Sequence, residues 1–140
     1  MIVLALDTSG PVASVAVADE TRIRYEACAA NQLKHSESIM PMVEEALCRS
    51  GVTLQQLNLL AVTAGPGSFT GIRIGVTAVK AMAHALNIPC LGLSSLEVTA
   101  AGIEAHDKIV CPLQDARVGQ VYGAAFRSGE RLMPDSAMKL

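Results

Sequence analysis

The repeat distance of the apolar residues changes once along this chain, and that change constrains the fold more than any other feature. Three short apolar runs, at residues 2–6, 13–18 and 23–29, are separated by turn residues such as Gly10-Pro11 and Asp19-Glu20. Short runs with tight turns between them predict three strands in an antiparallel meander. The apolar side chains then recur at helical spacing up to Gly51, which is the expected C-terminal cap of a first helix.

Pro41 lies early in that helical stretch, so the helix either begins near Ser38 or is kinked at Pro41. The elements that follow alternate: a strand at 59–63, a helix at 70–86, a strand at 90–93 and a helix that opens at Ser94. The order βββαβαβα predicts an α/β fold in which a mixed five-stranded sheet is flanked by helices.

A second meander is predicted near the end of the sequence. Residues 109–113 suit a strand, 114–120 a turn and 121–126 its hairpin partner, whereas the polar segment after Arg127 is left unassigned. We therefore predict a domain boundary near residue 105, with one domain over residues 1–105 and the opening hairpin of a second domain over residues 106–140.

Composition excludes some functions. The net charge is −2, from 11 basic and 13 acidic residues, and the basic residues are scattered. Nucleic-acid binding without sequence preference depends on clustered Lys and Arg, so we expect any role on RNA to be exerted through a partner. The four cysteines are widely spaced, which argues against a zinc site and fits reduced thiols. The apolar run at residues 1–6 is too short for a signal peptide or a membrane span, so the expected location is the cytoplasm.

A glycine-rich segment, GPGSFTG from Gly65 to Gly71, joins a predicted strand to a predicted helix. Glycines at such a place allow a sharp turn and can direct free amides at an anion. The segment lacks the Gly-Lys-Ser/Thr ending of a P-loop and the Gly-X-Gly-X-X-Gly spacing of dinucleotide sites. The simpler interpretation is a tight turn in which Ser68 or Thr70 caps the helix.

The helix predicted at residues 70–86 has little polar surface. Its polar side chains form one narrow stripe, made by Arg73, Thr77, Lys80 and His84. The remaining surface is apolar and rich in Gly and Ala, which let another helix approach closely. Two alternatives stay open: the helix is buried between the sheet and the chain's own first helix, which carries Met40 and Met42, or it forms a partner surface.

Four strings together resemble one family of proteins. They are LALDTS from Leu4, HSE from His35, GPGSFTGIRIG from Gly65, and DAR from Asp115 with Val121-Tyr122. In order and spacing they are similar to the TsaB/YeaZ family. The resemblance implies an actin-like, ribonuclease H-like fold of two related lobes, of which this chain has the first and the start of the second.

Where actin-like ATPases carry Asp-X-Gly-X-Thr, this chain has Asp7, Thr8 and Ser9, and Ser9 replaces the glycine. The resemblance therefore implies at most a vestigial phosphate-binding turn, and the alternative is that Asp7 only caps a turn. The catalytic TsaD-like paralogue has a His-X-Glu-Gly-His pair where Ser95 and Thr99 stand here. We therefore expect no catalytic residue and no metal ligand, and Ser94 with Glu97 predicts a capping box.

What the resemblance implies is a non-catalytic scaffold or activator of tRNA threonylcarbamoyladenosine synthesis. Its expected partners are the TsaD-like paralogue, a TsaE-like ATPase and, in isolation, a second copy of itself; tRNA is reached only through the complex and no membrane is involved. No tightly bound cofactor is expected, and ATP or ADP at a subunit junction is left open. The expected interface residues are Met42, Arg73, Ile74, Thr77, Ala78, Lys80 and Ala81.

Two alternatives belong to other classes. One is a free-standing actin-like ATPase or carbamoyl-transferring enzyme, and the other is a structural protein whose homodimer is its final state. His35 is expected to form a polar start to the first helix, while His84 and His106 are expected to be solvated.

Overall fold

The computed structural model describes residues 1–30, 35–105 and 107–139. Its first sheet has the strand order β3-β2-β1-β4-β5. These strands are β1 (Ile2–Asp7), β2 (Ala13–Asp19), β3 (Ile23–Ala29), β4 (Leu59–Gly65) and β5 (Cys90–Ser94). The β1–β2 and β2–β3 pairs are antiparallel, and the β1–β4 and β4–β5 pairs are parallel. The predicted mixed five-stranded sheet is confirmed.

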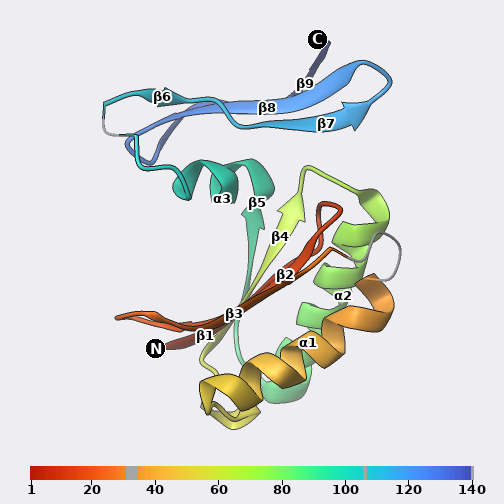
Figure 1. Ribbon diagram of the computed structural model, residues 1–140, viewed down its shortest axis with the longest axis vertical. Helices are drawn as coiled ribbons and strands as arrows, with labels where there is room; N and C mark the ends of the chain where they lie inside the picture. Colours follow the sequence, from red (N-terminus) through yellow and green to blue (C-terminus); the bar gives the residue numbers. More distant parts are fainter. Residues whose placement is uncertain (31–34, 106, 140) are drawn as a thin grey trace.

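Two helices cover one face of this sheet, α1 (His35–Ser50) and α2 (Phe69–Leu86) (Figure 1). The core forms where Leu4 and Leu6 of β1 meet Ile39 and Val43 of α1 and Val79 of α2. Alternate residues of β1 and β2 are buried, as the period of two in a strand requires when one face is covered. A short 3-10 helix, Leu54–Gln56, precedes β4.

Helix α1 begins at His35, so of the two alternatives the start near Ser38 was wrong by three residues, and a kink at Pro41 stays a prediction. Pro41 is therefore enclosed in the helix rather than placed in its first turn. The His35 ring makes a 2.9 Å hydrogen bond to the carbonyl of Gly10, which anchors the first turn to the loop before β2. That anchor is a long-range contact, which local sequence signals cannot show.

The second sheet contains β6 (Ile109–Val110), β7 (Leu113–Arg117), β8 (Gln120–Arg127) and β9 (Glu130–Lys139). The turn predicted at residues 114–120 was wrong, because β7 continues to Arg117 and only Val118 and Gly119 separate it from β8. The hairpin partner of β8 is thus β7, while β6 pairs with its far end. The polar side chains of β7 resemble a turn in sequence, yet they alternate in exposure as in a strand. The segment left unassigned after Arg127 is β9.

Helix α3 (Ser95–Ala101) lies between the two sheets (Figure 1). Its Leu96 and Ala100 form a small core with Ala124 and Phe126 of β8, separate from the core of the first sheet. The predicted domain boundary near residue 105 remains a prediction. Within the described residues, no helix is both long and apolar enough to cross a membrane.

Candidate functional site

The turn after β1 is held by its own side chains. One carboxylate oxygen of Asp7 accepts hydrogen bonds from the Ser9 amide at 2.8 Å, the Ser9 hydroxyl at 2.7 Å and the Thr63 hydroxyl at 2.6 Å. Asp7 therefore caps the turn, as one of the two interpretations predicted. Phosphate binding by Asp7, Thr8 and Ser9 stays a prediction.

The glycine segment packs directly onto this turn. The Ser68 amide donates to the Ser9 carbonyl at 2.7 Å, and the buried Thr8 hydroxyl donates to the Gly71 carbonyl at 2.7 Å. A Cβ atom on Gly67 would lie 2.5 Å from the Ser9 carbonyl oxygen. A Cβ on Gly71 would collide with the Thr8 carbonyl oxygen, and one on Gly75 with the Thr8 hydroxyl. These glycines thus allow α2 to approach the end of β1 closely.

Ser68 is the N-cap of α2, and its hydroxyl accepts from the Gly71 amide at 3.3 Å. This confirms the interpretation of the segment as a capped turn, with Ser68 rather than Thr70 as the cap. The amides of Ser9 and Ser68 both have partners within the chain. Neither is directed at an outside anion, so the anion-binding interpretation gains no support from them.

A groove of about 550 Å³ lies between α1 and α2. Five of the seven expected interface residues line it, namely Arg73, Ile74, Thr77, Ala78 and Ala81. It is completed by Ser36, Ile39, Met40 and Thr70. The two helices meet without covering this strip of α2, so intramolecular burial accounts for only part of the helix.

Met42 and Lys80 do not line the groove. Met42 is half-buried and packs against the main core, whereas Lys80 is exposed elsewhere on α2. Met40 lines the groove instead and has 41% of its surface exposed. The sequence places both methionines on the first helix, but only the rotation of α1 on the sheet decides which one faces the groove.

The small residues of α2 serve two different neighbours. Gly71 and Gly75 are buried against Thr8 and Val62 of the chain itself, so for this part of α2 the alternative of burial within the chain holds. Ala78 and Ala81 do line the groove, where their small side chains leave space between the helices.

One exposed aromatic residue was missed by the sequence analysis. The Phe69 ring, 74% exposed, lies at the start of α2 with the Arg73 guanidinium 5.3 Å from its centroid. Because Arg73 also lines the groove, the exposed Phe69 ring lies beside a residue of the groove. Aromatic and Arg side chains are enriched among the residues that contribute most to binding at protein interfaces. This enrichment is the signal by which the sequence could have indicated Phe69 as an interface residue.

Ser95 and Thr99, which the resemblance sets against the His pair of the TsaD-like paralogue, both have hydrogen-bond partners within the chain. Ser95 donates to the carbonyl of Pro66, and Thr99 donates to the Ser95 carbonyl at 2.8 Å. Ser94 caps α3 as predicted, but the Glu97 carboxylate is paired with Arg131, so the reciprocal half of the predicted capping box is not formed. In the described ranges no group of three or more His, Cys, Asp or Glu residues suits a metal ion. His84 is exposed, and His106 lies outside the described residues.

Comparison with known proteins assigns the fold and the family. Residues 29–139 match the family of TsaD, the tRNA N6-adenosine threonylcarbamoyltransferase. The tRNA threonylcarbamoyladenosine biosynthesis protein TsaB of Bacillus subtilis is 38% identical over 100% of this chain and 63% of its own length. Its Escherichia coli counterpart is 35% identical over 93% of this chain and 57% of its own length.

Comparison with solved structures gives the same family and the same fold. YeaZ from Pseudomonas aeruginosa matches with a TM-score of 0.85 and 33% identity, over 99% of this chain and 67% of that chain. A ROK hexokinase from Thermus thermophilus matches with a TM-score of 0.57 at 18% identity, over 94% of this chain and 49% of that chain, which shows the fold alone. The first sheet with its helices thus defines a lobe of the actin-like, ribonuclease H-like class. The chain belongs to the TsaB/YeaZ family, and it spans roughly three-fifths of the length of the two curated relatives.

Proposed function

We propose that this chain acts in the synthesis of threonylcarbamoyladenosine in tRNA as a non-catalytic scaffold and activator. The observation that carries the proposal is the groove between α1 and α2, which is lined by Met40, Ile74 and Ala78 and left open by the chain itself. Exposed apolar surface of this kind usually marks a protein interface. The occupant we propose is the TsaD-like catalytic paralogue, and in isolation a second copy of the same chain.

Activation follows from differential binding. A partner that prefers one conformation of the paralogue shifts its population towards that conformation. A preference of about 2–3 kcal/mol corresponds to a shift of tens- to a hundredfold, which is within the usual range of allosteric coupling. The TsaE-like ATPase and tRNA then act within the same complex in the cytoplasm, and any ATP or ADP is held at a subunit junction.

The competing function is a free-standing ATPase or carbamoyl-transferring enzyme. Such a site must offset charge that develops on the transferred group, commonly with a metal or clustered cations. The Asp7 carboxylate is engaged by Ser9 and Thr63, and the hydroxyls of Ser95 and Thr99 are engaged by backbone carbonyls. These contacts favour the scaffold.

The test is formation of the modified nucleoside on unmodified tRNA. We expect product when the paralogue, the TsaE-like ATPase and this chain are combined, little without this chain, and none from this chain alone. A longer form that spans the whole length of the relatives is assayed beside the 140-residue chain. Product from this chain alone would show an enzyme, and equal rates with and without it would remove the activator role.

We also expect the purified protein to hold no stoichiometric catalytic metal, because Ser95 and Thr99 stand where the paralogue has a His pair. Elemental analysis after purification without chelators measures this. Zinc or iron at about one atom per chain would contradict it.

A further inference from the structure

The first sheet is joined to α3 without a loop. Strand β5 ends at Ser94 and α3 begins at Ser95, so the chain passes directly from the first sheet into a helix that contacts β4 and β5 as well as β8. Since α3 also packs on β8 through Leu96 and Ala100, the β5–α3 junction is one place at which the angle between the sheets can change.

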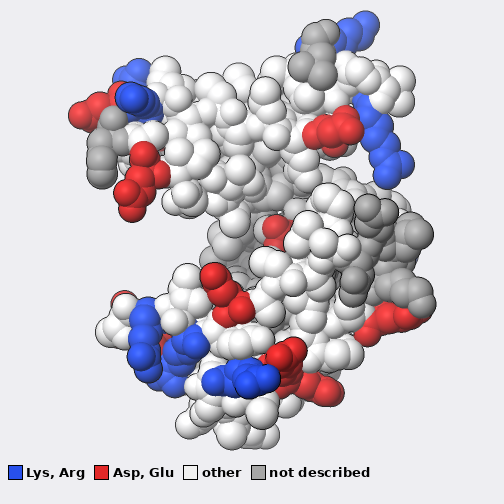
Figure 2. All heavy atoms as spheres, in the orientation of Figure 1, with Lys and Arg blue, Asp and Glu red and all other residues white. Residues whose placement is uncertain are grey.

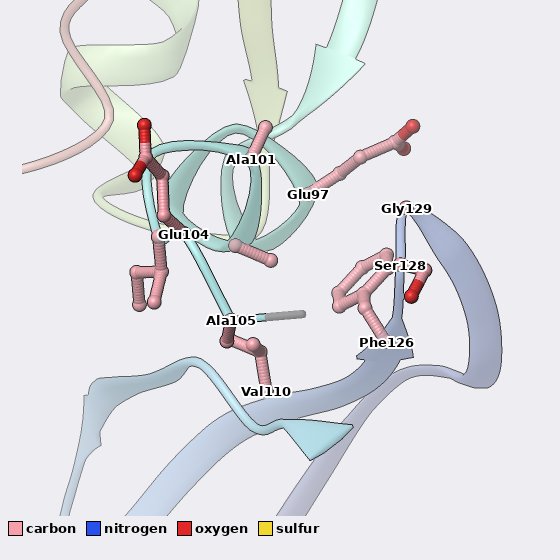
Figure 3. Close-up of a pocket in the computed structure, with 10 residues that line it drawn as sticks. Glu97, Ala101, Glu104, Ala105, Val110, Phe126, Ser128 and Gly129 are labelled. Carbon is pink, nitrogen blue, oxygen red and sulfur yellow. The ribbon is translucent and has the colours of Figure 1, made fainter. Parts of the chain in front are cut away.

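The contact between α3 and the second sheet is incomplete. A cavity of about 470 Å³ lies between them, lined by Ala100, Ala101, Val110 and Phe126 among others. Figure 3 shows the Phe126 ring directed towards this space, while the carboxylates of Glu97 and Glu104 point away from it. The apolar contact between α3 and the second sheet is therefore only partial, because the atoms that line the cavity lack contacts on that side.

A cluster of charged side chains lies at the β5–α3 junction. The Arg131 guanidinium of β9 donates to Glu97 of α3 at 2.8 Å and also to Asp135, and it lies 4.7 Å from the centroid of the Phe126 ring. The Ser94 hydroxyl donates to Asp135 at 2.7 Å. The cluster thus ties β9 to residues on both sides of the β5–α3 junction.

Two bulges in β9 make this geometry. Gly123 pairs with Ser136 and Ala125 with Met133, so Pro134 and Asp135 stand opposite Ala124 alone. Phe126 pairs with Arg131, so Leu132 is a further extra residue. In a regular strand, residues four apart are separated by roughly 13 Å. The two extra residues shorten that span and bring Asp135 back to Arg131.

We propose that Arg131 is a conformational clasp that sets the angle between the two sheets, and that its release lets the second sheet move about the β5–α3 junction. The Arg131 and Asp135 side chains are only 33% and 28% exposed, so solvent screens their attraction less than at an open surface. Hydrogen bonds to Asp135 and Glu97 raise the pKa of Arg131 above its ordinary value, which keeps the guanidinium charged. The proposal is independent of the proposed function.

The test compares Arg131→Met with Arg24→Met. Arg24 makes a similar pair with Asp19 at 2.6 Å in the first sheet and is 31% exposed, so it is a matched control away from the junction. The four exposed cysteines are first replaced by serine, and spin labels are placed at Val118→Cys in the β7–β8 turn and Gln55→Cys at the far end of the first sheet. We expect the inter-label distance distribution to broaden for Arg131→Met and to stay unchanged for Arg24→Met.

Amide hydrogen exchange distinguishes local release from general loss of stability. For Arg131→Met we expect exchange about tenfold faster at residues 95–101 and 130–139, with β1 and β2 unchanged. Asp135→Asn, which keeps the size of the side chain, should show a smaller effect and serves if Arg131→Met does not fold. An unchanged distance distribution, or exchange that rises equally in both sheets, overturns the clasp.

Discussion

Gly71→Ala should lower the free energy of unfolding by about 3 kcal/mol, the upper part of the range for overpacked sites. The added Cβ atom would collide with the Thr8 carbonyl oxygen. Thr8 is fully buried, so its backbone has no free space into which it could shift. Helix propensity alone predicts the opposite sign, because alanine is about 1 kcal/mol more favourable than glycine inside a helix. A lower free energy of unfolding for Gly71→Ala would therefore show that the collision with Thr8 outweighs the gain in helix propensity.

Urea denaturation followed by circular dichroism measures this difference. Gly10→Ala is the matched control, since a Cβ at Gly10 meets nothing within 4 Å. We expect the control to stay within about 0.5 kcal/mol of the unsubstituted chain. If Gly71→Ala is as stable as Gly10→Ala, the close packing of α2 on the end of β1 is not a constraint on this fold.

Ala78→Arg should give a folded monomer that no longer binds the TsaD-like paralogue. Ala78 lines the α1–α2 groove, where a long charged side chain would fill the space that we propose a partner helix occupies. An unpaired charge at the centre of an apolar interface costs at least about 3 kcal/mol of binding free energy, which is more than a hundredfold in affinity. Product formation in the tRNA assay should fall with it.

Sedimentation analysis gives the oligomeric state, and thermal unfolding checks that the fold survives. Ala85→Arg is the control, because Ala85 is exposed on the same helix and does not line the groove. We expect Ala85→Arg to remain a dimer and to support product formation when it is combined with the paralogue. A monomeric unsubstituted chain, or an Ala78→Arg variant that unfolds outright, would favour burial of α2 within one chain instead.

The sequence alone predicted the order of the strands and helices along the chain from β1 to α3. The change from strand to helical periodicity is local, and so are the Ser68 and Ser94 caps, which depend on residues three apart. The family followed from the glycine segment because its spacing is unusual. The stripe of exposed polar residues on α2 was also predicted correctly, since Arg73, Thr77, Lys80 and His84 are all exposed.

Tertiary structure decided the rest, because the remaining features depend on residues far apart in the chain. The polar strand β7 is a strand only because β8 pairs with it, and the sequence suggested a turn. Gly71 and Gly75 face Thr8 because β1 ends beneath α2, a contact that spans more than sixty residues. Met40 rather than Met42 faces the groove because the packing of Ile39 and Val43 sets the rotation of α1. The Arg131 cluster arises from two bulges in β9, which exist only in the pairing of β9 with β8.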